Sequence, residues 1–300
     1  MKITRAQELI AASRIVRAQR AITAARPYVA KMAEVVRHLA GTPDAARHPL
    51  FRPGEPGGRS AVIAIAADRG FAGAYNSSVI RAAERLARTQ REAGSEVDLM
   101  AVGRKVESYF RYRGEPLAFS LTGMSDRPGF DDARRVAAAV MEPFAAGEVS
   151  QVHMVYTRFM SIGSQAVTVR QLVPLQPDED HPAGEERDVA GFKTDYEFEP
   201  DPAEILDRLL PAWVEAEVLA AMLEAAASEQ AARQRAMKAA TDNADELITT
   251  LRRIMNRARQ DAITTEIMEI VGGSEALRQA RQAGGAGTHH ETFEPAAEPA

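Results

Sequence analysis

The stretch that decides the fold lies near the carboxyl end and reads Ser228-Glu-Gln-Ala-Ala-Arg-Gln-Arg-Ala-Met-Lys-Ala-Ala-Thr-Asp-Asn243. It belongs to a run, residues 212–271, that contains neither Gly nor Pro, the residues that most often interrupt a helix. As a single helix this run would be roughly 90 Å long, far longer than a globular domain needs. A helix of this length indicates a long helical partner.

Small apolar residues repeat along this run at alternating spacings of four and three, which is typical of a coiled-coil seam. The seam comprises Val214, Val218, Ala221, Ala225, Ser228 and Ala232, and it resumes at Leu247, Leu251, Ile254 and Ala258. Small side chains allow two helices to approach closely. Asp201-Pro-Ala-Glu204 supplies an N-cap and a first-turn proline, so the helix is expected to begin there. Gly272 and Gly273 are expected to end it.

A matching seam occurs near the amino terminus, where spacings of three and four connect Ile15, Ala18, Ile22, Ala25, Val29, Met32, Val36 and Leu39. Pro27 is expected to kink this helix without ending it, because the spacing continues in phase past it. Two terminal helices with matching seams, separated by a domain that returns the chain, predict an antiparallel coiled coil. The first helix is basic, with six cations against Glu8 over residues 1–26: Lys2, Arg5, Arg14, Arg17, Arg20 and Arg26.

Between the two helices the pattern changes to that of an α/β domain. Strands are predicted at residues 61–67, 97–102, 151–156 and 165–172, and helices at residues 78–93, 105–112 and 131–145. This alternation predicts a mostly parallel, open, Rossmann-like sheet. The last strand follows its neighbour closely, so we expect it to form an antiparallel edge.

The fold class is therefore α/β, with a long antiparallel coiled coil of the terminal helices around a central Rossmann-like domain. The expected organisation is a first coiled-coil helix and connector (1–57), the α/β domain (58–175), a flexible linker (176–195), the long last helix (196–282) and a disordered tail (283–300).

Composition narrows the functional classes. The 300 residues are 45% hydrophobic, enough for a folded core, and the net charge of −5 argues against a dedicated nucleic-acid binder. The absence of Cys excludes thiol nucleophiles and disulfides in this chain. Neither a membrane-spanning run nor the apolar core of a signal peptide is present in the sequence, so a cytoplasmic setting is the default expectation.

Candidate chemistry is sparse. Asp68-Arg-Gly-Phe-Ala-Gly73 follows a strand and precedes a helix, but it matches neither glycine-rich nucleotide motif, so a structural turn is favoured over a phosphate loop. In Gly103-Arg-Lys105 the two cations are interpreted as a solvated surface pair rather than as a phosphate-binding site. His153 is expected to be a packed histidine, and His289 with His290 to be tail residues. We therefore expect no catalytic, cofactor-binding or metal-binding residues.

Ordered motifs over nearly the whole chain resemble the gamma subunit of the F-type ATP synthase. Near the start and centre they are Lys2-Ile-Thr-Arg-Ala-Gln-Glu-Leu-Ile-Ala-Ala-Ser13, Asp68-Arg-Gly-Phe-Ala-Gly-Ala-Tyr-Asn76, Val102-Gly-Arg-Lys105 and Ser164-Gln165. Towards the end they are Tyr196-Glu-Phe-Glu-Pro-Asp-Pro202, Glu229-Gln-Ala-Ala-Arg233, Met237-Lys-Ala-Ala-Thr-Asp-Asn243, Asn256-Arg-Ala-Arg-Gln260, Ile263-Thr264 and Glu269-Ile-Val-Gly272.

The resemblance implies a non-catalytic rotor shaft that couples proton-driven rotation of the c-ring to ATP synthesis on the beta subunits of an alpha3-beta3 hexamer. It implies epsilon and the c-ring as further partners, no cofactor, and a peripheral position on the cytoplasmic side of a bacterial plasma membrane. It assigns a beta-subunit catch to Gln7, Arg259, Gln260 and Thr264, and a foot facing epsilon or the c-ring to Tyr196, Phe198 and Glu199. Positive charge at Lys2, Arg5, Arg252 and Arg257 is expected to form a basic collar that meets acidic beta loops.

The chain departs from the family in lacking the usual residues before Lys2-Ile-Thr. Either the start is misassigned, or the first helix is short and the upper shaft is a single helix. Two other functional classes stay open at this point: a nucleotide-dependent α/β enzyme with helical oligomerisation arms, and a coiled-coil adaptor.

Overall fold

A computed structural model describes residues 2–40, 51, 57–175 and 202–284. The chain forms two compact units, Met1–Thr241 and Asp242–Ala300. Helix α5 (Pro202–Gly284) contributes to both units. The first unit also contains helix α1 (Lys2–Ala40) and the α/β domain between the two helices.

The α/β domain is built on a five-stranded sheet in the order β3-β2-β1-β4-β5. Its central strand β1 (Ser60–Ile65) is buried at every position and pairs in parallel with β2 (Val97–Val102) and β4 (Gln151–Phe159). Strand β3 (Leu117–Leu121) extends the parallel part, and β5 (Gln165–Val173) pairs antiparallel with β4. The prediction of an open, mostly parallel sheet with an antiparallel edge is confirmed.

Helices cover both faces of this sheet, and alternate residues of β1 enter two different cores. Val62 packs with α2 (Tyr75–Glu92) and α3 (Arg104–Tyr112) on one face. Ile63 faces the other way and shares a core with α4 (Phe130–Ala145), α5 and α1. Both faces of β1 are therefore covered by apolar side chains, which explains its nearly uninterrupted apolar sequence.

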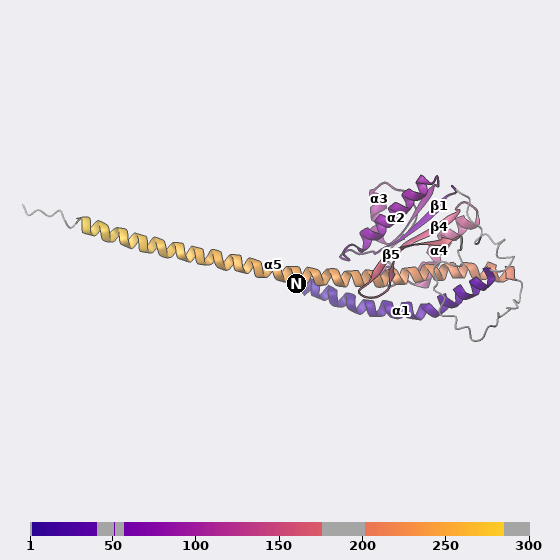
Figure 1. Cartoon of the computed structure of the whole chain (residues 1–300), viewed down its shortest axis with the longest axis horizontal. Coiled ribbons are helices and arrows are strands. Elements are labelled where there is room, and N and C mark those ends of the chain that lie inside the picture. Colours follow the sequence, from indigo (N-terminus) through magenta and orange to yellow (C-terminus); the bar gives the residue numbers. More distant parts are fainter. Residues whose placement is uncertain (1, 41–50, 52–56, 176–201, 285–300) are drawn as a thin grey trace, which may run out of the picture. The chain divides into compact units, whose positions relative to one another are not determined.

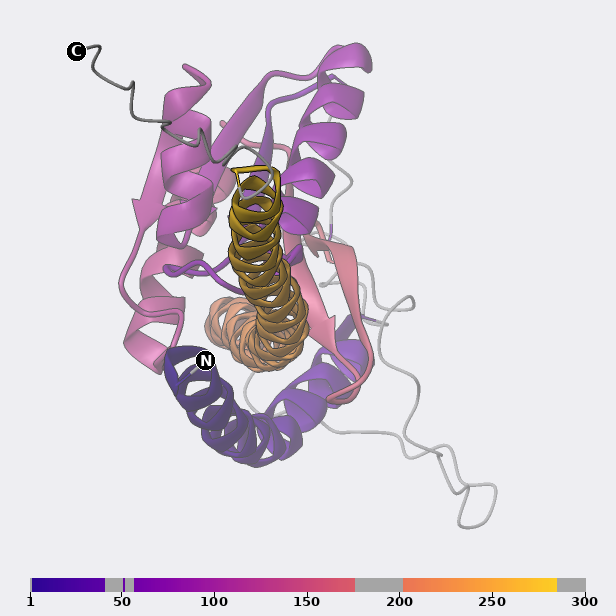
Figure 2. The same ribbon diagram turned by 90° about the vertical axis from the view of Figure 1, so that its left-hand side faces the viewer.

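Helices α1 and α5 lie side by side and antiparallel within the first unit (Figures 1 and 2). The Thr241 hydroxyl contacts the Thr4 hydroxyl at 2.7 Å near the start of α1, whereas Met32 shares a core with Trp213 near the start of α5. Ala225 of the predicted seam is 3% exposed and the other seam residues up to Ser228 are also buried. The antiparallel arrangement of the two helices is thus confirmed, whereas the seam residues Val214 to Ser228 are buried in a core that the α/β domain shares.

Two expectations about secondary structure are wrong. Strand β3 was not anticipated, because it is only five residues long and is half-buried, so its apolar pattern is weak. Helix α5 does not end at Gly272 and Gly273 but continues to Gly284. Glycine costs about 1 kcal/mol in a helix interior, an amount that the good helix formers on both sides can offset. Pro27 lies inside α1 as predicted.

None of the described helices is long and apolar enough to cross a membrane. The linker over 176–195 and the last residues of the tail, 285–300, lie outside the described residues.

Candidate functional site

At the carboxyl edge of the sheet, the side chain of Asp68, three residues after β1, joins the segments that follow β2 and β3. Its Oδ1 accepts hydrogen bonds from the backbone N–H of Arg104 at 3.0 Å and of Gly123 at 2.9 Å. Its Oδ2 accepts from the N–H of Ser125 at 2.9 Å. Partial burial by itself raises the pKa of Asp68, but the three N–H donors outweigh it, and the net pKa is lowered. Asp68 is therefore held ionised.

This carboxylate lies at the first turn of α3, where a free backbone N–H group could otherwise bind an anion. Gly103, which precedes α3, has φ +110° and passes so close to β1 that a Cβ would lie 2.1 Å from the Ala66 carbonyl oxygen. The absence of a side chain at Gly103 thus allows its backbone to lie close to that of Ala66. The prediction that residues 68–73 form a structural turn agrees with this geometry.

A buried ion pair ties α5 to that turn. Arg233 Nη2 donates to Glu229 Oε1 at 2.6 Å, and the two residues are 5% and 1% exposed. The same guanidinium donates to the Gly70 carbonyl oxygen, from Nη2 at 3.2 Å and from Nε at 3.4 Å. Burial raises the pKa of Glu229, and the Arg233 charge opposes that rise. Arg233 therefore neutralises the buried carboxylate of Glu229 and also binds the turn at Gly70.

Asp126 joins α1, α5 and the turn. Its Oδ1 accepts from Arg14 Nη1 of α1 at 2.8 Å and from Gln230 Nε2 of α5 at 3.1 Å. Arg69 Nη2, in the turn, lies 3.3 Å from its Oδ2. Three segments far apart in sequence thus converge on one carboxylate. We call the contacts of Asp68, Asp126, Glu229 and Arg233 the polar junction.

A second set of contacts attaches α5 to the β4–β5 hairpin. The Ser228 hydroxyl donates to the Thr157 carbonyl oxygen at 3.0 Å. Arg235 donates to the Ile162 carbonyl oxygen at 2.7 Å and also to the Gln165 side chain. Arg233 and Arg235 are two residues apart and so point to roughly opposite sides of α5, where they bind two separate parts of the domain.

The histidine prediction agrees with the structure. His153 is 9% exposed and lies in β4, and burial lowers its pKa, so it is neutral and packed. Among the described residues, no group of three or more His, Asp or Glu side chains is arranged to hold a metal ion. His289 and His290 lie outside the described residues.

The predicted partner-binding residues of the first helix lie on the surface of its first two turns. Lys2, Arg5 and Gln7 are all exposed. The predicted foot residues Tyr196, Phe198 and Glu199 lie outside the described residues.

The predicted residues of the last helix belong to the unit Asp242–Ala300. Arg252, Arg257, Arg259, Gln260 and Thr264 are all exposed on α5. Arg257, Gln260 and Thr264 are spaced by three and four, so they share one helix face, and Arg252 and Arg259 share another. The joint catch and collar with α1 stay predictions.

Sequence analysis missed the roles of Glu229, Arg233, Asp126 and Asp68. The first pair carried a usable signal, since Glu229 and Arg233 are an acid and a base four residues apart that directly follow the seam residues Ser228 and Ala232, and so border the buried face. Asp126 carried none, because its partner Arg14 is 112 residues away.

Comparison with known proteins is consistent with this architecture. The family model described as ATP synthase matches residues 1–277. The chain is 47% identical over 282 residues to the ATP synthase gamma chain of Parafrankia sp., with 92% of each chain covered. It is 48% identical over 285 residues to that of Nocardioides sp., covering 93% of this chain and 92% of the relative.

Solved structures agree with the fold. A chain of the central stalk and c-ring structure of the Tetrahymena thermophila mitochondrial ATP synthase superposes with a TM-score of 0.58 at 25% identity, covering 80% of this chain and 99% of that one. A chain of the Euglena gracilis mitochondrial ATP synthase gives a TM-score of 0.54 at 17% identity, covering 96% and 98%, and supports the fold alone. With a family match over most of its length and relatives nearly half identical to it, the chain belongs to the ATP synthase gamma chains.

Proposed function

We propose that this chain is the central rotor shaft of an F-type ATP synthase, coupling proton-driven rotation of a c-ring to ATP synthesis on beta subunits. The observation that carries the proposal is the polar junction. It links α1, α5 and the α/β domain through ionic and backbone contacts, so force applied to the domain is transmitted to both helices. Its partners in this role are the alpha3-beta3 hexamer, epsilon and the c-ring.

Rotation acts by changing which surface of the shaft each beta subunit meets. A shaft that presents different side chains on different faces binds the open and closed states of beta unequally, and therefore shifts their populations in turn. The shaft itself needs only to resist twisting. Contacts such as Arg233 to Gly70 supply that resistance at the junction, because they join elements rather than residues of one helix.

The chain is proposed to be non-catalytic, with ATP chemistry on the beta subunits. In its α/β domain the first strand-to-helix turn, residues 68–73, matches neither glycine-rich nucleotide motif, and the Asp68 carboxylate within it disfavours a phosphate nearby because the charges are alike. This geometry weighs against the alternative of a nucleotide-dependent enzyme with helical oligomerisation arms.

Contact with beta is assigned to exposed side chains on both terminal helices. Gln7, Arg259, Gln260 and Thr264 form the proposed catch. The collar of Lys2, Arg5, Arg252 and Arg257 would meet acidic beta loops by complementary charge.

The foot of Tyr196, Phe198 and Glu199 would meet epsilon or the c-ring.

The domain boundaries given by the sequence, with the α/β domain at 58–175, are retained in this proposal. The chain would lie peripherally on the cytoplasmic side of a bacterial plasma membrane, held there through its complex.

Co-assembly tests the function. The full-length chain, mixed with its cognate alpha and beta subunits, is expected to form a stoichiometric complex whose ATP hydrolysis exceeds that of alpha and beta alone. Failure to join the complex would refute the shaft role. ATP turnover by the isolated chain would favour the enzyme alternative, and equal pairing with unrelated helical proteins would favour the adaptor.

A further inference from the structure

The hairpin of β4 and β5 lies along one face of α5. Four residues of α5 bind this hairpin, and their spacings of seven, four and seven place them on one side of the helix. They are Glu217, Glu224, Ser228 and Arg235. Glu217 pairs with Arg170 of β5, and Glu224 accepts a hydrogen bond from the Phe159 N–H at 3.3 Å. The hairpin is therefore bound to α5 over about five turns of the helix.

The hairpin tip, residues 160–165, is held in shape for its contact with Arg235. The Ser161 N–H donates to the Ser164 carbonyl oxygen at 2.9 Å, and the Ser164 N–H donates to the Ser161 carbonyl oxygen at 3.2 Å. The Gln165 side chain donates to the Ile162 carbonyl oxygen at 2.9 Å and accepts from Arg235 Nη2. Arg235 Nη1 donates to the same carbonyl oxygen at 2.7 Å. Arg235 thus binds both the backbone of the tip and the side chain that closes it.

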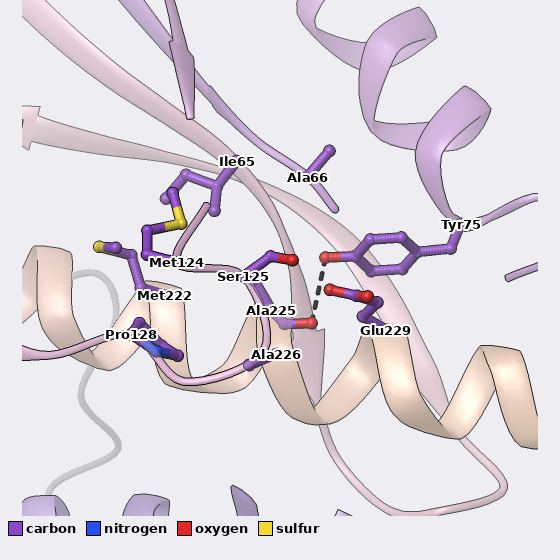
Figure 3. A pocket seen from close by; sticks show the side chains of 10 residues that line it. All are labelled: Ile65, Ala66, Tyr75, Met124, Ser125, Pro128, Met222, Ala225, Ala226 and Glu229. Atoms are coloured by element: carbon purple, nitrogen blue, oxygen red, sulfur yellow. Dashed lines mark hydrogen bonds between the residues drawn. The ribbon is translucent and has the colours of Figure 1, made fainter. Parts of the chain in front are cut away.

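Other sides of α5 are held by α2 and by the turn at residues 68–73. Tyr75 of α2 donates its hydroxyl to the Ala225 carbonyl oxygen at 3.0 Å (Figure 3), and Arg233 donates to the Gly70 carbonyl oxygen. Arg233 and Arg235 differ by about 160° around the helix and by about 3 Å along it. A contact on one side alone would let the helix roll about that contact, whereas two contacts on opposite sides at one level oppose rolling.

We propose that the contact of Arg235 with the hairpin tip prevents α5 from rotating about its own axis within the α/β domain. The inference rests on the proposed rotor function, because a shaft has to carry torque between its domain and its helix. Arg235 is a positioning residue in this role. Its side chain is exposed, so its hydrogen bonds add little to the net stability of the fold, yet they complete the two-sided hold on α5.

Single-molecule rotation of the full-length chain, assembled with its cognate alpha and beta subunits, tests this role. The chain has no Cys, so Tyr112→Cys, at an 89% exposed position of α3, gives one attachment point for a probe on the α/β domain. In this background Arg235→Ala should raise the variance of the probe's angular fluctuations during catalytic pauses by about half or more, because one of two opposed hydrogen-bonded contacts is lost. Arg235→Lys restores a donor towards the Ile162 carbonyl oxygen and should recover most of the stiffness.

Two further variants complete the test. Gln165→Ala removes the side-chain acceptor on the hairpin and should reproduce the effect of Arg235→Ala. Lys238→Ala is the matched control, because Lys238 is an exposed cation of the same helix that has no hydrogen-bonding partner within the described part of the chain, and it should leave the fluctuations unchanged. The thermal unfolding midpoint of Arg235→Ala should move by no more than about 2–4 °C, so loss of the fold would not account for the softening.

The proposal is overturned if Arg235→Ala and Gln165→Ala both fluctuate as little as the parent chain. A parent chain that does not assemble into a rotating complex would instead count against the proposed rotor function, so the two failures are distinguishable.

Discussion

Replacing Arg233 with methionine removes the positive half of the buried ion pair and leaves Glu229 as an uncompensated buried charge. With Arg233 and Glu229 only 5% and 1% exposed, solvent cannot screen the remaining carboxylate. Breaking such a pair costs about 3–5 kcal/mol. The lost bond to the Gly70 carbonyl oxygen adds little, because that residue is partly open to water. We therefore expect Arg233→Met to lower the free energy of unfolding by about 3–5 kcal/mol.

The double variant Glu229→Met/Arg233→Met should recover most of this loss, since replacing both members of a buried pair with apolar side chains of similar volume is often neutral. The assay is urea unfolding of the full-length chain followed by the fluorescence of Trp213, its one tryptophan, which is buried at 8% exposure. Arg88→Met is the control, because Arg88 and Glu92 form an ion pair with the same i,i+4 spacing on the surface. Its effect should be at most about 1 kcal/mol.

The cost in Arg233→Met should also depend on pH. Burial already raises the folded-state pKa of Glu229 above its ordinary value of 4.5 in the wild type, and Arg233 opposes that rise, so removing Arg233 raises this pKa further in the variant. Between these two pKa values the folded chain binds more protons than the unfolded chain, so the variant's stability falls as pH rises through that window. The deficit relative to wild type should shrink on lowering the pH from about 8 to about 5. A loss no larger than that of Arg88→Met, or a double variant as unstable as the single one, would refute the reasoning.

Three further outcomes are expected. Gly103→Ala should prevent normal folding, because the new methyl group would lie 2.1 Å from a carbonyl oxygen, whereas Gly94→Ala, at φ +90° with open space around it, should cost only about 1–2 kcal/mol in thermal unfolding. Asp68→Asn should cost about 1.5–3 kcal/mol, since three N–H groups lose a charged acceptor. Because the pKa of Asp68 is lowered, its charge stabilises the fold above its ordinary pKa of 3.8, and this contribution is lost as pH falls through the lowered value, so the variant should show a flatter acid-unfolding profile. Arg259→Ala should weaken coupled ATP synthesis without changing the unfolding midpoint, because the side chain is exposed, and unchanged coupling with a normal fold would contradict the proposed catch.

Much of the fold could be predicted because it depends on local periodicity. The apolar run of β1 and the four-three spacing around Ala225 report burial directly, and both are buried in the structure. β3 escaped notice because a short strand at the edge of a sheet buries only some of its side chains. The predicted end of α5 at Gly272 and Gly273 was wrong because the low helix propensity of glycine is a weak preference, which the surrounding helix formers override.

The polar junction was less predictable for a different reason. Sequence spacing shows which residues share a helix face, so the Glu229 and Arg233 pair could have been inferred. It does not show which charged residues from distant parts of the chain will contact each other. Asp126 contacts Arg14, Arg69 and Gln230 only in the folded chain, and no local sequence pattern predicts these contacts.

Asp68 has a consequence for what the domain can bind. Its carboxylate acts as a built-in competitor, tethered beside the N–H groups that an anion would need. A rigidly positioned group has an effective concentration above that of any dissolved rival. Free phosphate or nucleotide would have to displace the Asp68 carboxylate, and the displaced carboxylate would remain nearby without its hydrogen bonds. The backbone N–H groups at the start of α3 are thus already occupied within the chain itself.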